Sequence, residues 1–329
     1  MARRAALIFG VAILLAATAQ TAYAESEDAT FSILFENDVF FKTDRDYTNG
    51  VQFSYTTGPD DAKSWAVDTA RLLPFFARTG EVRTSYALGQ NMYTPVDTNL
   101  ANPPLTERPY AGYLYGAVGL MEKNDTRLDQ LQLQLGIVGP ASLAEETQKW
   151  VHSILHDAKP QGWGTQLHGE PGLALIYERS LKLIPPQSLW GLVFDAEPHF
   201  GGAVGNVYDY LNAGAMLRFG FNLPDDYGVL RIEPGLPGSN FFDPNGDFSA
   251  YVFAGVDGRA VGRNIFLDGN TFQSSRSVVK KNLVGDLELG GAVTFRHARI
   301  AFTHVFRSRE YASQSSPDQF GAVSVSFRL

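Results

Sequence analysis

The sequence contains no cysteine among its 329 residues. Structural disulfides and thiolate chemistry are therefore excluded, although an exported protein would be able to form disulfides. After residue 24 no apolar run reaches about 18 residues, which is the length that a transmembrane helix needs. Acidic residues outnumber basic ones, and the formal net charge of −8 argues against nucleic acid as a partner.

The first 24 residues have the pattern of a secretory signal peptide. Two arginines precede an apolar segment at residues 5–17, which is too short to span a bilayer comfortably. Residues 22–24, Ala-Tyr-Ala, fit a small-x-small cleavage motif. We therefore expect cleavage after Ala24 and a single exported domain at residues 25–329.

Apolar and polar residues alternate with a period of two along much of the remaining chain. The pattern is clearest in LQLQLGI, Leu131–Ile137, where leucines fall on one face and glutamines on the other. About twelve segments fit it: 29–41, 48–58, 82–93, 110–123, 126–139, 170–183, 190–203, 207–220, 249–262, 282–295, 298–308 and 319–329. Their lengths suit tilted strands with roughly 9–11 membrane-spanning residues.

Twelve is an even number, as an antiparallel barrel with both termini in the periplasm requires. We therefore predict an all-β fold, a transmembrane antiparallel β-barrel of about 12 strands in the bacterial outer membrane. The chain ends in Phe327-Arg328-Leu329, which nearly matches the aromatic ending recognised by the barrel-insertion machinery. A secreted β-sandwich shows the same alternation and is the alternative interpretation.

One pair of strand ends is unusually polar. Residues 36–50, ENDVFFKTDRDYTNG, place several charged side chains where the first strand ends and the second begins. The topology of a twelve-stranded barrel puts this stretch on the extracellular side. The connection after the fifth strand lies on the same side, and its sequence predicts a short helix near 142–157. Ser142 and Glu145 have the spacing of a capping box at the start of that helix.

The predicted helix carries the most interesting of the six histidines. Gln148, His152 and His156 are spaced by four residues and share one helix face. A membrane-facing rim implies an amphiphilic substrate, and hydrolysis of an ester there needs a base. A neutral imidazole can take a proton from water near neutral pH. His152 is the candidate general base because its helix lies at the same rim as Asn37 and Asp38. Most histidines are structural or solvent-exposed, and His156 has that simpler interpretation.

The polar stretch also offers ligands for a metal ion. Asn37, Asp38, Thr48 and nearby backbone carbonyls are hard oxygen donors, which suit Ca²⁺. A bound calcium ion would polarise an ester carbonyl. Zinc is disfavoured because cysteine and an H-E-x-x-H motif are both missing, and serine catalysis lacks a G-x-S-x-G motif. A charged loop without a catalytic role is the alternative interpretation of this stretch.

In its motifs and their order the chain resembles the outer-membrane lipid A 3′-O-deacylases, the LpxR family of twelve-stranded barrels. The resemblance covers essentially the whole mature chain and rests on four stretches. These are END with DRDYTNG (36–38 and 44–50), LGQNMYTP (88–95), RPYAGY (108–113), and GIVGP through EETQKWVH to QGWGTQL (136–167). It implies calcium-dependent removal of the 3′-linked acyloxyacyl group of lipopolysaccharide, with lipid A and outer-membrane lipids as partners.

The resemblance also implies roles for individual residues. His152 matches the general base that activates water, and Gln148 matches the glutamine one turn before it. Asn37 and Asp38 match the active-site pair at the end of the first strand, with Asp38 the stronger candidate as calcium ligand. Thr48 matches the threonine of the D-Y-T segment.

Two departures from the family's pattern concern the periphery of the site. Residues 96–107 contain no lysine where the family has one, and Arg108 is the first basic residue after them. The family's acid and tyrosine after the helix fall here near Ala158 and Pro160. Two other functions stay open from the sequence: an outer-membrane phospholipase, and a barrel without enzymatic activity such as a porin or an adhesin.

Overall fold

The computed structural model describes residues 28–38, 46–59, 61–76, 79–156, 158–232, 234 and 238–329. The expected signal peptide and the loop residues Lys42, Asp44 and Arg45 lie outside these ranges. The strands are β1 (Thr30–Asn37), β2 (Asp46–Thr56), β3 (Glu81–Thr94), β4 (Ala111–Lys123), β5 (Arg127–Val138), β6 (Glu170–Leu181), β7 (Ile184–Leu189), β8 (Leu192–Gly205), β9 (Tyr208–Phe221), β10 (Phe248–Asn264), β11 (Leu283–Phe295), β12 (Ala298–Arg307) and β13 (Asp318–Arg328).

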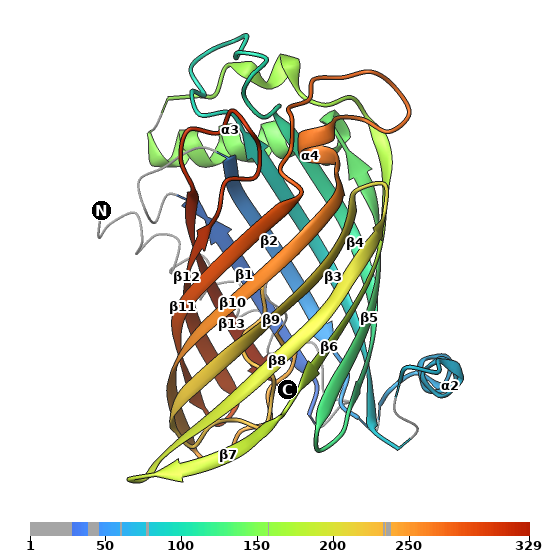
Figure 1. Cartoon of the computed structure of the whole chain (residues 1–329), viewed down its shortest axis with the longest axis vertical. Coiled ribbons are helices and arrows are strands. Elements are labelled where there is room, and N and C mark those ends of the chain that lie inside the picture. The colour runs from blue at the N-terminus through green and yellow to red at the C-terminus, as the bar shows by residue number, and fades with distance from the viewer. Residues whose placement is uncertain are drawn as a thin grey trace.

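Twelve of these strands form a closed antiparallel barrel, which confirms the predicted fold class (Figure 1). Neighbouring strands pair in sequence order, β1 pairs with β13, and β6 pairs with β8 to close the ring. The short strand β7 was not predicted from the sequence. It pairs with the first residues of β8 and extends the sheet beyond the ring. Each predicted segment otherwise corresponds to one strand, with its ends shifted by a few residues.

The two ends of the barrel differ in what covers them. At the end reached by β1, called the outer end here, lie α3 (Ala144–Leu155) and α4 (Ile265–Asp268) (Figure 1). At the opposite, inner end lie α2 (Ser64–Leu72), β7 and the last residue of the chain, whose amide bonds to the Ala29 carbonyl. Helix α2 forms within the segment DAKSWAVDTARLLP, residues 61–74. None of the described helices is long and apolar enough to cross a membrane.

Alternate residues of each strand face the membrane and the lumen. On β5, Leu135 is 55% exposed on the membrane side, whereas Gln134 on the lumen side is 2% exposed. The lumen of the described barrel holds many charged groups, and these are paired: Arg218 binds Asp195, and Arg259 bridges Asp257 and Asp286. Buried charges need such partners because water no longer solvates them.

The outer end of the lumen is closed by aromatic side chains. Phe266 of α4 stacks on Tyr93 of β3, with ring centroids 4.1 Å apart, and Tyr93 shares a hydroxyl hydrogen bond of 3.1 Å with Tyr208. Tyr47, Tyr113, Tyr115, Tyr210 and Phe320 belong to the same buried cluster. This layer lies beneath the connections at the outer end.

The inner part of the lumen is filled by the connection between β9 and β10, residues 222–247, which we call the plug. Its described residues turn back into the barrel. Val229 packs with Met216 and Phe253 on one wall, and Leu230 packs with Leu34 on another. The pattern of residues alone does not predict a role for this long connection. The structure shows that it contributes to the core.

Candidate active site on the outer wall

Helix α3 lies against the outside of the barrel wall, over the outer ends of β3 and β4. It follows a 3-10 turn, η2 (Pro140–Ser142), whose Ser142 carbonyl accepts a hydrogen bond of 2.7 Å from Gln90 of β3. The predicted capping box is wrong, because the residue before the helix is Leu143 in the left-handed region and no side chain caps the helix. Ser142 instead anchors the turn to the wall.

The wall beneath α3 is buried on its membrane-facing side. On β3 the exposed Tyr86 and Leu88 mark that side, and by alternation Met92 and Thr94 lie on it as well. Both are nevertheless buried, with exposures of 2% and 0%. Segments at the outer end of the barrel, including α3, therefore cover this part of a surface that would otherwise meet lipid.

Thr48 reaches this covered patch through a β-bulge. Tyr47 faces the lumen, where its ring lies 5.4 Å from that of Tyr93. The register of β2 shifts between Tyr47 and Asn49, so Thr48 is the extra residue of the bulge. Its hydroxyl shares a hydrogen bond of 2.7 Å with the hydroxyl of Thr94. Bulges commonly redirect side chains next to functional sites.

Asn37 and Asp38 stand at the end of β1 beside this bulge. Asn37 is the register partner of Asn49, whose side-chain amide donates a hydrogen bond of 3.0 Å to the Glu36 carbonyl. Asp38 directly follows the strand and is 1% exposed. The structure thus brings the predicted residues of β1 and β2 together.

Gln148 connects α3 to the same region. It is 3% exposed, and its side-chain oxygen accepts a hydrogen bond of 2.7 Å from the indole of Trp163. Trp163 belongs to η3 (Gly162–Thr165) and forms a buried cluster with Met92, Tyr110 and Ala144. Met92 is the register partner of Asn49, so this cluster links the helix to the β1–β2 corner. Sequence reasoning did not single out Trp163.

His152 lies one helical turn after Gln148 and is partly exposed. Its Nδ1 atom is 2.6 Å from the carbonyl oxygen of Ala158. A carbonyl only accepts hydrogen bonds, so in the neutral ring Nδ1 holds the proton and Nε2 holds the lone pair. His156 does not continue the helix face, because it is the C-cap residue with φ 58°.

Arg108, the first basic residue after the lysine-free segment, serves a different purpose. It is fully buried, 3.2 Å from Glu310 and 3.8 Å from Asp46, and it lies over the Tyr93 ring. Burial disfavours its charge, but the two carboxylates outweigh burial and leave the pKa of the guanidinium raised. Arg108 thus joins connections at the outer end to the barrel, and its charge is already paired with Glu310 and Asp46.

The donors near the β1–β2 corner suit a hard cation. In the described part of the chain no three His, Asp or Glu side chains gather in a metal-binding group. A cation at this corner would therefore depend on the Asp38 carboxylate together with amide and carbonyl oxygens and water. Calcium accepts such mixed oxygen ligands in flexible geometry.

The fold and the site define an outer-membrane β-barrel that carries buried polar residues on its outer wall under a surface helix. The chain belongs to the family described as outer membrane protein LpxR, whose profile matches residues 7–329. No curated protein matches the sequence.

A solved structure with the same fold is known. LpxR from Salmonella typhimurium is similar with a TM-score of 0.75 at 20% identity, over 91% of this chain and 100% of that one. The β-domain of the Bordetella autotransporter BrkA reaches only 0.45 at 8% identity, over 93% of this chain and 100% of that one. The NalP translocator domain from Neisseria meningitidis reaches 0.37 at 10% identity, over 100% of this chain and 97% of that one.

Proposed function

We propose that this protein is a calcium-dependent lipid A deacylase, a carboxylic ester hydrolase that removes the 3′-linked acyloxyacyl group of lipopolysaccharide at the outer leaflet. Membership of the LpxR family supports this assignment. The observation that carries it is the position of Thr48, Asn49 and Met92 on the membrane-facing side of the wall, buried under extracellular segments. An amphiphilic substrate reaches such a site sideways from the membrane.

The proposed mechanism assigns one task to each group. His152 accepts a proton from water through Nε2, while the Ala158 carbonyl holds the ring by Nδ1. Gln148 is held by Trp163 and fixes the depth of the helix against the wall. Asp38 and Asn37 would hold calcium, which when bound supplies positive charge for the ester oxyanion.

The filled lumen favours an enzyme over a diffusion porin. The plug and the aromatic layer occupy the described interior, and a cavity of about 50 Å³ lies between Arg231, Asn240 and the β4–β6 wall. Roughly 10–15 Å³ is needed for each water, so this cavity has room for a few water molecules.

Lipid A profiles test the proposal directly. We expect membranes containing the protein to lose the 3′ acyloxyacyl mass from lipid A when incubated with calcium, and to keep it in EGTA. Mass spectrometry of lipid A from cells with and without the protein measures this. Unchanged lipid A in the presence of folded protein would contradict the assignment. Release of fatty acid from phospholipid instead would support a phospholipase, which the missing lysine at residues 96–107 leaves room for.

Adding a methyl group at Gly112 of β4, beneath the start of α3, should also impair the site. A Cβ atom at Gly112 would collide with the Ser142 hydroxyl and the Ala144 methyl, whereas at Gly116, on the same face of β4, the nearest atom is 4.0 Å away. We expect Gly112→Ala to lower deacylation at least about tenfold, because displacement of catalytic groups by 1 Å can cost about a hundredfold. Gly116→Ala is the matched control and should retain activity. Equal activities would show that α3 tolerates displacement.

A further inference from the structure

The tip of the plug, formed by Arg231 and Ile232, contacts β1 at the residue that precedes the candidate calcium ligands. Arg231 donates from Nε to Glu36 Oε1 at 2.6 Å, and its Nη1 donates to Glu288 of β11. All three side chains are at most 4% exposed. The backbone amide of Ile232 also donates to Glu36 Oε1, at 3.2 Å. Glu36 is therefore held by two donors from the plug.

Glu36 connects this lumen contact to the opposite face of the wall. Its side chain points into the barrel, while its carbonyl accepts the amide hydrogen bond from Asn49 on the membrane-facing side. Asn37 and Asp38 are the next two residues. A movement of Glu36 would therefore move the candidate ligands and their neighbour on β2 together.

A second contact leads from Arg231 to the bulge. The guanidinium lies 5.4 Å from the centroid of the Phe320 ring, and that ring packs edge-on against Tyr47 at 4.9 Å. Tyr47 directly precedes Thr48, the extra residue of the bulge. The tip of the plug thus supports both strands that meet at the candidate site.

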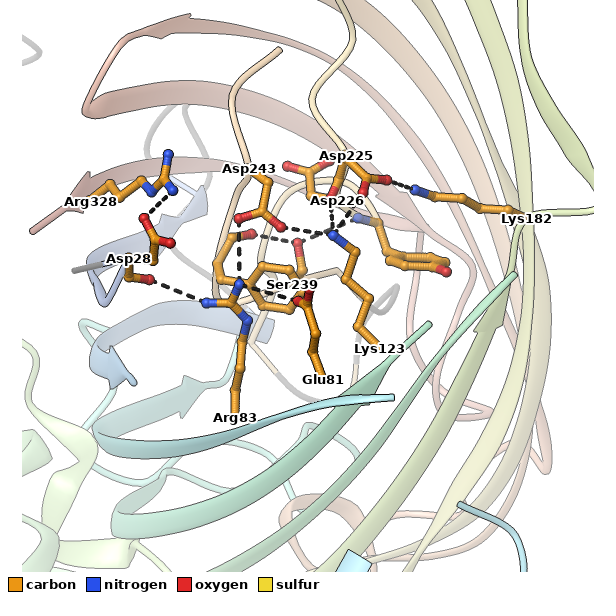
Figure 2. Close-up of polar contacts among 12 residues, drawn as sticks. Asp28, Glu81, Arg83, Lys123, Lys182, Asp225, Asp226, Ser239, Asp243 and Arg328 are labelled. Carbon is orange, nitrogen blue, oxygen red and sulfur yellow. Dashed lines mark hydrogen bonds and ion pairs between the residues drawn. The ribbon is translucent and has the colours of Figure 1, made fainter. Parts of the chain in front are cut away.

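The base of the plug, which contains Asp225 and Asp243, is held by separate contacts at the inner end of the barrel. Figure 2 shows Lys123 of β4 between Asp225 and Asp243, with 2.8 Å to each carboxylate. Lys182 also binds Asp225, and Arg83 of β3 lies 3.5 Å from Asp243. The two lysines lower the pKa of the Asp225 carboxyl to about 2 against the opposing effect of burial, so the anchor stays charged at neutral pH. A plug fixed at its base can support a strand at its tip.

We propose that Arg231 is a positioning residue of the active site: acting from the lumen through Glu36, it holds the end of β1 so that Asn37 and Asp38 keep the geometry that calcium binding needs. This inference rests on the proposed function for its catalytic consequence. Its structural part, support of β1 by the plug, stands by itself. Residues that orient ligands from behind commonly change metal affinity by about 10–100-fold when replaced.

Arg231→Met tests the proposal, with Arg299→Met as the matched control. Arg299 is another buried arginine that contacts the plug, but it binds Asp226 and the Ser239 carbonyl near the base. Two readouts on the purified full-length protein in detergent decide the matter. They are amide hydrogen exchange in peptides covering residues 33–38, and direct calcium binding by calorimetry.

We expect Arg231→Met to speed exchange at residues 36–38 and to weaken calcium binding about tenfold. Arg299→Met should change neither. Equal exchange and equal calcium affinity in folded Arg231→Met protein would overturn the proposal. An equal effect of Arg299→Met would also overturn it, because the effect would then be general loosening.

Glu36→Met provides a second variant in case the first fails to fold. It leaves Arg231 paired with Glu288 and removes the same support from the side of β1. It should reproduce the faster exchange, and unchanged exchange would overturn the proposal. If the wild-type protein neither binds calcium nor deacylates lipid A, the proposed function fails, while the exchange experiment still decides whether the plug supports β1.

Discussion

His152→Ala is expected to abolish detectable lipid A deacylation while the barrel still folds. A positioned general base contributes about 10²–10⁴-fold to a hydrolysis rate, and an alanine leaves no group to accept the proton from water. His152 is partly exposed, and its ring bonds to the carbonyl of Ala158, six residues away. Its loss should therefore cost the barrel little. Mass spectrometry of lipid A measures the activity. The change in electrophoretic mobility between heated and unheated protein shows whether the barrel is folded.

His156→Ala is the matched control for this experiment. His156 lies four residues on, but its left-handed backbone ends the helix, so its side chain does not continue the face of Gln148 and His152. This variant should keep its activity. Unchanged lipid A profiles between wild type and His152→Ala would remove His152 from the role of base.

The alternation of residues predicted the barrel because a strand between lipid and a wet lumen must change polarity at every step. Leu131–Ile137 illustrates this, and the structure places its leucines and glutamines on opposite faces of β5. The same rule did not find β7. Residues 184–189 lie beyond the ring, pair with one neighbour only and contain two prolines, so they lack the regular pattern.

The side of the wall that carries the candidate site was not predictable from alternation. A bulge at Thr48 adds one residue to β2, and such an insertion changes which side chains share a face. The burial of Met92 and Thr94 depends on segments that are distant in sequence. A capping box at Ser142 was a reasonable local prediction, but contact with Gln90 and Gly112 places Ser142 in a turn on the wall.

The plug was equally hidden from sequence reasoning. Residues 222–247 resemble a long polar loop with glycine and proline, and nothing in their own pattern indicates burial. Their acidic residues and Arg231 find partners on β1, β4, β9, β11 and β12, which only the closed barrel brings around them. Charge pairing across the lumen is a property of the assembled fold.

Asp38→Asn should abolish deacylation at low calcium and recover part of the activity at high calcium. The substitution keeps the size of the side chain and an oxygen donor but removes the negative charge, and calcium affinity depends strongly on ligand charge. In the described part of the chain no cluster of three acidic or histidine ligands compensates for the loss. We expect the half-saturating calcium concentration to rise by about a hundredfold, because the number of charged ligands tunes calcium affinity over several orders of magnitude. Deacylation measured over a calcium titration tests this.

The two active-site variants are most informative when compared. His152→Ala removes the proton acceptor, so no calcium concentration should restore its activity. Asp38→Asn weakens the binding of the ion but leaves the base in place, so millimolar calcium should restore part of its rate. If calcium rescues neither variant, Asp38 has a role other than ligand. If wild-type deacylation is already insensitive to EGTA, the oxyanion must be stabilised by the protein's own donors, and the buried amides of Asn49 and Gln148 would be the first groups to examine.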